Sequence, residues 1–217
     1  DCNVLATQRL LEAVLTAGNH IKRLVYASSS SVYGDAISLP VLETATPHPI
    51  SPYGVTKLAA EHLCSLYYHN FGVPTVSLRY FTVYGPRQRP DMAFHRFCKA
   101  VAEQQPIHVF DDGNQTRDFT YVSDIVEANV RSAAIGTSGS VMNIAGGSRV
   151  SVRHVIELLQ EISGLPVQVT FEQKQHGDVR DTFADIGSAT ELIGYKPRVS
   201  LREGLEREFE AIVALYG

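Results

Sequence analysis

Two short apolar runs, each leading directly into a polar loop, constrain the fold of this chain most. They lie in the segments KRLVYASSSSVYG (residues 22–34) and GVPTVSLRYFTVYGP (residues 72–86). Helical periodicity precedes the first run over residues 4–17, ends at Gly18, and separates the two runs over residues 53–70. Continuous apolar strands that alternate with helices are typical of a parallel sheet covered on both faces. We therefore predict an α/β fold whose functional loops follow the carboxyl ends of the strands.

The second half of the chain mixes short helices and strands, which predicts a smaller lobe. We expect residues 1–90 to form the larger domain and residues 91–217 to form mainly this mixed lobe, some of whose segments could return to the first domain. The predicted elements are helices over 92–104, 123–134 and 151–162, strands in IHVF, RDFTYV, VMNIA and VQVTF, and two closing helices that begin at the capping boxes Ser188-x-x-Glu191 and Ser200-x-x-Glu203.

The composition argues against several classes of partner. A formal net charge of −4 with scattered Lys and Arg gives no basic surface for nucleic acid or an anionic membrane. No apolar run approaches the roughly 18 residues of a membrane span. Three cysteines (Cys2, Cys64 and Cys98) without metal-ligand spacing favour reduced thiols and a cytoplasmic protein. The eight histidines stand singly, without a His-x-x-x-His pair, so we predict no metal site.

The segment SPYGVTKLAAE, residues 51–61, places a tyrosine and a lysine four residues apart at the start of the second predicted helix. If this turn is helical, Tyr53 and Lys57 lie side by side on one face. A cation beside a phenol favours the phenolate, which can act as a general base. A Tyr-x-x-x-Lys spacing alone is also typical of an ordinary surface helix, so the interpretation depends on the flanking motifs.

Five motifs occur in an order and spacing that resemble a known enzyme family. They are YASSSSVYG, SPYGVTK, SLRYFTVYGPRQRPDMAF, TRDFTYVSDI and HGDVRDTFADI, and they extend over essentially the whole chain. The sequence is similar to the extended short-chain dehydrogenases/reductases, in particular the NAD-dependent nucleotide-sugar 4-epimerases. The resemblance implies the C-terminal part of a doubly wound parallel-sheet Rossmann domain, with a smaller mixed α/β substrate lobe.

The glycine-rich turn of this family has no counterpart in the chain. In the family a first strand, a Gly-x-x-Gly-x-x-Gly turn and a helix hold the dinucleotide, whereas the only glycine pair here is Gly146-Gly147. We therefore expect the chain to be N-terminally truncated by roughly three βα units and to be inactive alone. One alternative is a non-catalytic fragment that binds UDP but not NAD.

The resemblance implies catalytic roles for Ser29, Tyr53 and Lys57. Tyr53, as phenolate, would take the proton of the sugar 4-hydroxyl while hydride passes to NAD, and return of the hydride to the other face of the 4-keto sugar would invert C4. Lys57 would reach the nicotinamide ribose, and Ser29 would bond the sugar 4-oxygen. Asn3 and Tyr80 match positions near the cofactor, although Asn3 would also suit a helix N-cap and Tyr80 the core.

Four further residues match positions around the sugar. Related dehydratases and decarboxylases carry carboxylates where this chain has Ser30 and Ser31, which favours epimerisation without elimination. Thr82 stands where many UDP-glucose 4-epimerases have Asn, and resembles the UDP-glucuronate 4-epimerases, in which it bonds the sugar carboxylate. These three hydroxyls would form a neutral donor cup, with Arg89 as a further substrate contact. Thr82 would equally suit the end of a strand.

The resemblance assigns the nucleotide to residues of the second lobe. Arg117 and Arg180 match the diphosphate and ribose contacts of the family, and a guanidinium suits bidentate binding of phosphate. Asp178 would bind ribose hydroxyls. Phe110, which ends the strand IHVF, would frame the uracil or simply belong to a core strand.

These motifs predict NAD-dependent 4-epimerisation of a UDP-sugar, with UDP-glucuronate favoured over UDP-glucose, UDP-galactose and their N-acetyl forms. The competing hypotheses are the UDP-binding fragment and a UDP-glucuronate decarboxylase or sugar dehydratase. Members of the family commonly dimerise through two helices, which correspond here to residues at about 3–17 and 53–70. We therefore also expect a homodimer.

Overall fold

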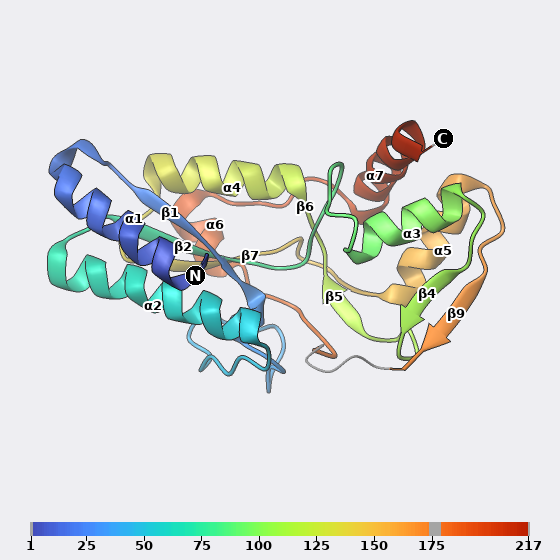
Figure 1. Ribbon diagram of the computed structural model, residues 1–217, viewed down its shortest axis with the longest axis horizontal. Helices are drawn as coiled ribbons and strands as arrows, with labels where there is room; N and C mark the ends of the chain where they lie inside the picture. The colour runs from blue at the N-terminus through green and yellow to red at the C-terminus, as the bar shows by residue number, and fades with distance from the viewer. Residues whose placement is uncertain (1, 174–178, 217) are drawn as a thin grey trace.

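A three-stranded parallel sheet forms the centre of the larger lobe (Figure 1). The computed structural model describes residues 2–173 and 179–216. The strands, in their order across the sheet, are β1 (Leu24–Ser29), β2 (Thr75–Tyr80) and β7 (Val141–Ile144). In the β1–β2 pair Leu24 lies opposite Thr75 and Ser29 opposite Tyr80, so both strands end at the same edge. The predicted parallel sheet is confirmed. The predicted domain boundary near residue 90 stays a prediction. Strand β7 lies beyond this residue in the chain and joins the sheet of the larger lobe.

Helices cover both faces of this sheet. On one face lie α1 (Val4–Ala17), followed by the 3-10 turn Gly18–His20, and α2 (Pro52–Phe71); on the other lie α4 (Val122–Ile135) and α6 (Gly187–Ile193). Alternate residues of β1 point to opposite faces. Leu24 and Tyr26 pack against α1 and α2, whereas Val25 packs against the cluster that contains α4 and α6. Burial on both faces explains why the strands are apolar throughout.

Three helices build the core of the smaller lobe: α3 (Ala93–Ala102), α5 (Val152–Ser163) and α7 (Leu201–Tyr216). They contribute Phe94, Leu159 and Leu205, each at most 2% exposed. The strand pairs are parallel β4 (Ile107–Phe110) with β9 (Val169–Glu172), antiparallel β5 (Thr116–Asp118) with β8 (Arg149–Ser151), and parallel β3 (Val83–Tyr84) with β6 (Thr120–Tyr121). The strand predicted in RDFTYV is therefore wrong as one element, because β5 and β6 pair with different strands.

One of the two predicted capping boxes is also wrong. At the start of α7, the Glu203 N–H donates to Ser200 Oγ at 3.3 Å, which is one half of the predicted box, and Glu203 Oε1 accepts from Arg207. At α6, no side chain caps the helix, and the Ser188 hydroxyl donates to Glu43 Oε2 at 3.1 Å instead. The helix begins at Gly187, so Ser188 lies within its first turn and not at the cap position, and its hydroxyl bonds a carboxylate from a distant segment.

Two further observations concern the cysteines and the helices. All three cysteines are free; Cys2 is exposed, and Cys64 and Cys98 are buried. No described helix combines the length and the apolarity that crossing a lipid bilayer requires.

Candidate active site

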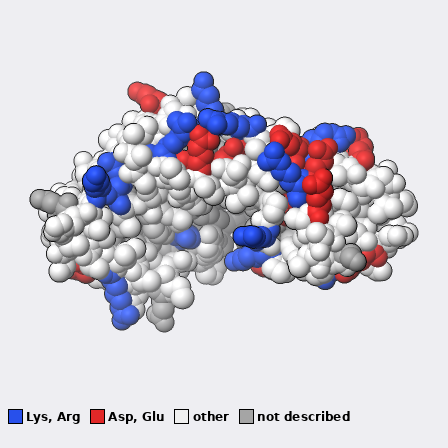
Figure 2. Space-filling model, turned by 90° about the horizontal axis from the view of Figure 1, so that it is seen from above, with Lys and Arg blue, Asp and Glu red and all other residues white. Residues whose placement is uncertain are grey.

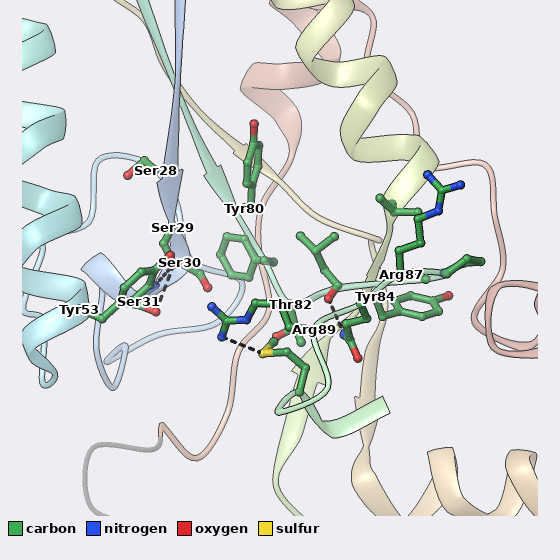
Figure 3. Close-up of a pocket in the computed structure, with 17 residues that line it drawn as sticks. Ser28, Ser29, Ser30, Ser31, Tyr53, Tyr80, Thr82, Tyr84, Arg87 and Arg89 are labelled. Atoms are coloured by element: carbon green, nitrogen blue, oxygen red, sulfur yellow. Dashed lines mark hydrogen bonds between the residues drawn. The ribbon is translucent and has the colours of Figure 1, made fainter. Parts of the chain in front are cut away.

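A cleft of about 790 Å³ opens at the carboxyl edge of the parallel sheet, where ligands of open α/β sheets bind (Figure 3). The end of β1, the start of α2 and the segments that follow β2 and β3 form its walls. The lining residues are Ser28 to Ser31, Tyr53, Tyr80 to Arg89, Met92 and Val122. The cleft thus collects seven of the predicted site residues: Ser29, Ser30, Ser31, Tyr53, Tyr80, Thr82 and Arg89.

The first turn of α2 fixes Tyr53 at this cleft. The Ser51 hydroxyl accepts a hydrogen bond of 3.1 Å from the Gly54 N–H, and Pro52 occupies the first helical position. Gly54 allows the turn to approach Ser31 closely, because a Cβ atom at Gly54 would lie 2.4 Å from the Ser31 carbonyl oxygen. Tyr53 therefore lies beside Ser31 (Figure 3), with 51% of its surface exposed.

Lys57 lies on the same side of α2 as Tyr53. Its Nζ is 5.7 Å from the centroid of the Tyr53 ring and 5.4 Å from that of Tyr26, and it donates a 2.8 Å hydrogen bond to the Ala27 carbonyl. The side-by-side placement predicted from the spacing is confirmed. Burial lowers the pKa of Lys57 from its ordinary value. A partly desolvated ammonium is stabilised by any nearby anion.

Three hydroxyl groups enter the cleft from the serine loop (Ser29–Ser31). Ser29 ends β1, and a 3-10 turn over Ser30–Val32 follows. Ser29 Oγ accepts from the Ser31 N–H at 3.2 Å and donates to Ser31 Oγ at 3.1 Å. These bonds orient the loop. Because the three side chains are neutral, the loop offers a ligand hydrogen-bond donors and acceptors without a formal charge.

Thr82 and two arginines form the opposite wall. The Thr82 carbonyl accepts a 2.9 Å hydrogen bond from the Thr120 N–H, which ties this segment to β6. Thr82 and Arg89 both line the cleft, on the side opposite the serine loop (Figure 3). The Arg89–Asp91 ion pair of 2.9 Å is largely exposed, so it holds the guanidinium only weakly. Arg87 and Arg89 line the cleft, and its described lining contains no Asp or Glu. This charge pattern favours an anionic ligand.

The two remaining residues predicted near the cofactor occupy different places. Tyr80 lines the cleft from the end of β2, and its hydroxyl donates to Asn129 Oδ1 at 2.8 Å. Asn3 lies outside the cleft lining and donates to Thr56 Oγ1 in α2 at 3.0 Å. Asn3 is the N-cap residue of α1, as the alternative interpretation expects, but its side chain makes no capping bond to the helix. Asn3 instead joins α1 to the beginning of α2.

The described residues that are predicted to bind the nucleotide, Phe110, Arg117 and Arg180, lie outside the main cleft. Arg117 Nη1 donates to the Arg180 carbonyl at 2.8 Å, which makes these two arginines neighbours. Phe110 ends β4, and the guanidinium of Arg96 lies 5.7 Å from its ring centroid. Asp178 lies outside the described residues. Figure 2 shows Lys and Arg side chains beside the hollow between the two lobes.

Sequence reasoning missed a buried charge cluster next to the cleft. Glu61 of α2 and Arg79 of β2 form a two-point ion pair, with Nη2–Oε1 2.6 Å and Nε–Oε2 3.1 Å. Ser28 donates to Glu61 Oε2 at 2.5 Å. One signal was available, because Glu61 continues the four-residue spacing of Tyr53 and Lys57. In the described part of the chain, no group of His, Cys, Asp and Glu is placed to hold a metal ion.

Comparison with known proteins places this geometry in a family. The model of the NAD dependent epimerase/dehydratase family matches residues 1–145. The chain is 46% identical over 217 residues to the uncharacterized UDP-glucose epimerase YtcB of Bacillus subtilis (strain 168), covering 99% of this chain and 67% of that protein. It is 38% identical over 209 residues to the UDP-glucuronate 4-epimerase of Thermodesulfobacterium geofontis (strain OPF15), covering 95% and 64%.

A solved structure agrees with these relatives. The UDP-glucuronic acid 4-epimerase of Bacillus cereus, in complex with UDP-glucuronic acid and NAD, matches with a TM-score of 0.94 and 46% identity, over 99% of this chain and 68% of that one. The chain spans about two thirds of the length of the relatives it matches.

NAD is the cofactor of this family, and it is bound in the Bacillus cereus structure. The cleft lies at the carboxyl edge of a parallel sheet, where open α/β sheets bind such cofactors, and an exposed phenol with a neighbouring ammonium stands there. The chain belongs to the NAD dependent epimerase/dehydratase family, of the extended short-chain dehydrogenase/reductase type that its motifs resemble.

Proposed function

We propose that the protein is a NAD-dependent UDP-sugar 4-epimerase that prefers UDP-glucuronate. One observation carries the proposal: Tyr53, the serine loop and Thr82 line a single cleft, and the Lys57 ammonium lies 5.7 Å from the centroid of the Tyr53 ring. The names of YtcB and of the Bacillus cereus enzyme specify UDP-sugar epimerases, which supports the same class of reaction.

Tyr53 is the general base in this proposal. As phenolate it accepts the proton of the sugar 4-hydroxyl, and it returns this proton after the sugar has turned over in the cleft. The Lys57 ammonium stabilises the phenolate. Ser29 bonds the sugar 4-oxygen and holds it near Tyr53. A bound NAD would supply the hydride acceptor and donor for C4, so the reaction would consume no outside oxidant or reductant.

The cleft wall supports the preference for an acidic sugar. Ser30, Ser31 and Thr82 provide neutral donors to the sugar carboxylate, and hydrogen bonds of this kind hold an anion without locking it in one orientation. That property suits a sugar that must turn over before the hydride returns. Arg87 and Arg89 add positive charge to the same cleft, without a described acidic side chain in its lining.

The UDP part of the substrate extends toward the smaller lobe in this proposal. Arg117 and Arg180, which are joined by a 2.8 Å hydrogen bond, bind the diphosphate and the ribose. Phe110 frames the uracil, with Arg96 on its ring. Asp178, outside the described residues, completes the ribose contacts.

The cleft favours epimerisation over elimination or decarboxylation. These related reactions need a further acid or base close to the sugar. Ser30 and Ser31 occupy the positions where the related enzymes carry carboxylates, and the described lining offers no Asp or Glu in their place. The alternative of a UDP-binding fragment differs in one measurable property, since such a fragment would not bind NAD.

We further propose a homodimer through α1 and α2. These helices pack against each other and expose six large apolar side chains: Leu5, Leu10, Leu15, Val55, Leu66 and Phe71. Exposed apolar residues gathered on two adjacent helices are typical of an interface. Sedimentation of the Leu10→Glu variant should show a monomer where the parent protein sediments as a dimer. The cytoplasmic location stays a prediction.

The full-length protein, supplied with NAD, tests the proposed reaction. NMR should detect inversion at C4 of UDP-glucuronate, with a higher kcat/KM than for UDP-glucose. Faster turnover of UDP-glucose would overturn the substrate preference but keep the reaction. Binding of UDP without NAD binding and without inversion of either sugar would instead support the non-catalytic fragment.

A further inference from the structure

A buried hydrogen-bonded cluster connects the helix of the proposed base to both neighbouring strands. The Glu61 carboxylate accepts from Ser28 in β1 at 2.5 Å and pairs with Arg79 in β2 at 2.6 Å. Ser28, Glu61 and Arg79 are 2%, 3% and 5% exposed. Arg79 also donates to the Tyr33 hydroxyl at 2.7 Å, which connects the cluster to the residue that follows the turn Ser30–Val32. The cluster therefore lies between α2 and the edge of the sheet where the cleft opens.

Glu61 occupies the same stripe of α2 as the two proposed reactive groups. Tyr53, Lys57 and Glu61 follow one another at intervals of four residues, so their side chains leave the helix on one side, over about 12 Å of its length. All three side chains reach β1 or the turn that follows it. Tyr53 lies beside Ser31, Lys57 bonds the Ala27 carbonyl at 2.8 Å, and Glu61 bonds Ser28.

The Ser28–Glu61 bond restricts rotation of α2 about its axis and sliding along β1. Both movements would carry Tyr53 away from Ser31 and break the Lys57–Ala27 hydrogen bond, which anchors the ammonium beside the Tyr53 ring. Arg79 holds the carboxylate at both oxygens, and such a two-point pair fixes orientation as well as distance. A buried ion pair adds little net stability compared with apolar residues of similar volume, so orientation is the property that it contributes here.

We propose that Glu61 is a positioning residue of the epimerase site, which holds the Tyr53–Lys57 stripe in register with the serine loop through Ser28. This inference rests on the proposed function, because it assigns Tyr53 the role of base. Glu61 does not line the cleft and acts only through Ser28 and the helix.

The Ser28→Ala variant tests this proposal most cleanly, because it removes the hydrogen bond but leaves the Glu61–Arg79 pair intact. In the full-length, NAD-loaded protein, we expect kcat at neutral pH to fall about tenfold to a hundredfold, as small displacements of reacting groups do. KM for the UDP-sugar should stay within about twofold, because the nucleotide contacts lie in the other lobe. The acidic limb of the kcat–pH profile should move to higher pH.

Thr75→Val is the matched control. The Thr75 hydroxyl donates to the Cys64 carbonyl at 3.0 Å, so it also ties a buried part of α2 to β2, but beyond the reactive stripe. This variant should lower the unfolding temperature and leave the kcat–pH profile unchanged. Glu61→Met keeps a similar side-chain volume but has no oxygen acceptor for the Ser28 hydroxyl, so it should reproduce the profile of Ser28→Ala. If Glu61→Met does not fold, Ser28→Ala alone decides.

A measurement without turnover separates this proposal from the proposed reaction. Phenolate absorbs at about 295 nm. The difference in this absorbance between each protein and its Tyr53→Phe derivative follows the titration of Tyr53 alone. The midpoint should lie at higher pH in Ser28→Ala than in the parent protein, because the ammonium is displaced. An unchanged midpoint would overturn the positioning role even if the protein epimerises UDP-sugars. A shifted midpoint would support it even if neither tested sugar is inverted.

Discussion

The Nζ atom of Lys57 lies 5.7 Å from the centroid of the Tyr53 ring, one turn further along α2. Removing the phenol oxygen therefore removes the proposed base and leaves the ammonium and the helix in place. Tyr53→Phe should lower kcat for C4 inversion by roughly a hundred- to ten-thousandfold, the usual contribution of a general base. Calorimetry should find the affinity for UDP nearly unchanged, because the proposed nucleotide contacts lie in the smaller lobe.

Tyr68→Phe is the control for this substitution, because Tyr68 also belongs to α2 but packs near Gly139, far along the helix. It should retain the kcat of the parent protein. Inversion by Tyr53→Phe at the parent rate would eliminate Tyr53 as the base.

Thr82→Asn should weaken the preference for the acidic sugar. The change replaces a hydroxyl of the proposed carboxylate cup with a larger amide, while the Thr82 backbone contact to Thr120 remains possible. We expect the ratio of kcat/KM values for UDP-glucuronate and UDP-glucose to fall by roughly two- to tenfold, the value of one hydrogen bond. The two sugars should be assayed in competition in one sample. A ratio equal to that of the parent protein would remove Thr82 from the cup.

Gly54→Ala should disturb the site through the backbone. The new Cβ would lie 2.4 Å from the Ser31 carbonyl oxygen, so the serine loop or the helix must move. Overpacking of this kind costs about 1–3 kcal/mol, and the better helix propensity of alanine recovers up to about 1 kcal/mol of it. We therefore expect a small loss in the free energy of unfolding but a clear fall in kcat. His62→Ala, at an exposed position of α2, is the control. It should keep the free energy of unfolding and the kcat of the parent protein.

Local patterns explain why much of the site was predictable. The four-residue spacing of Tyr53 and Lys57 needs only a helix for the two side chains to meet. The apolar runs of β1 and β2 indicate burial on both faces, and a parallel sheet brings the loops after its strands to one edge. The serine loop and Thr82 follow neighbouring strands, so their meeting in one cleft required no further information.

The contacts that escaped prediction join residues that are far apart in the chain. Glu43 accepts from Ser188 across 145 positions, and no local pattern predicts this contact. Glu61 and Ser28 are 33 positions apart, and their contact depends on how α2 packs on the sheet. For the same reason the sequence could not predict where Phe110 and Arg117 lie relative to the cleft, because their positions depend on how distant segments pack.

A buried carboxyl group in α7 holds the loop that lines the cleft. Glu208 is 1% exposed, and its Oε2 accepts a 2.9 Å hydrogen bond from the Gly85 N–H. Its Oε1 has no hydrogen-bond partner among the described residues. Burial raises the pKa of Glu208 to about 8, and the Gly85 bond offsets only part of this effect.

This shift makes the free energy of unfolding depend on pH with a defined sign. Below about pH 4 the carboxyl is protonated in both states. As the pH rises, the unfolded state loses this proton near its ordinary pKa of about 4.3, whereas folded Glu208 keeps it up to about pH 8. Glu208 therefore lowers the free energy of unfolding progressively as the pH rises through this window, by at most roughly 1.4 kcal/mol per pH unit.

Glu208→Gln should abolish that dependence, because glutamine keeps an acceptor for the Gly85 N–H but does not ionise. Urea unfolding at about pH 5 and about pH 8 should give a difference in free energy of unfolding, variant minus parent, that increases with pH. Asp118, whose pKa burial raises to about 6, is present in both proteins, so its contribution cancels in this difference. Parallel pH curves for the two proteins would mean that folded Glu208 ionises at the same pH as an unfolded glutamate, despite its burial against Gly85.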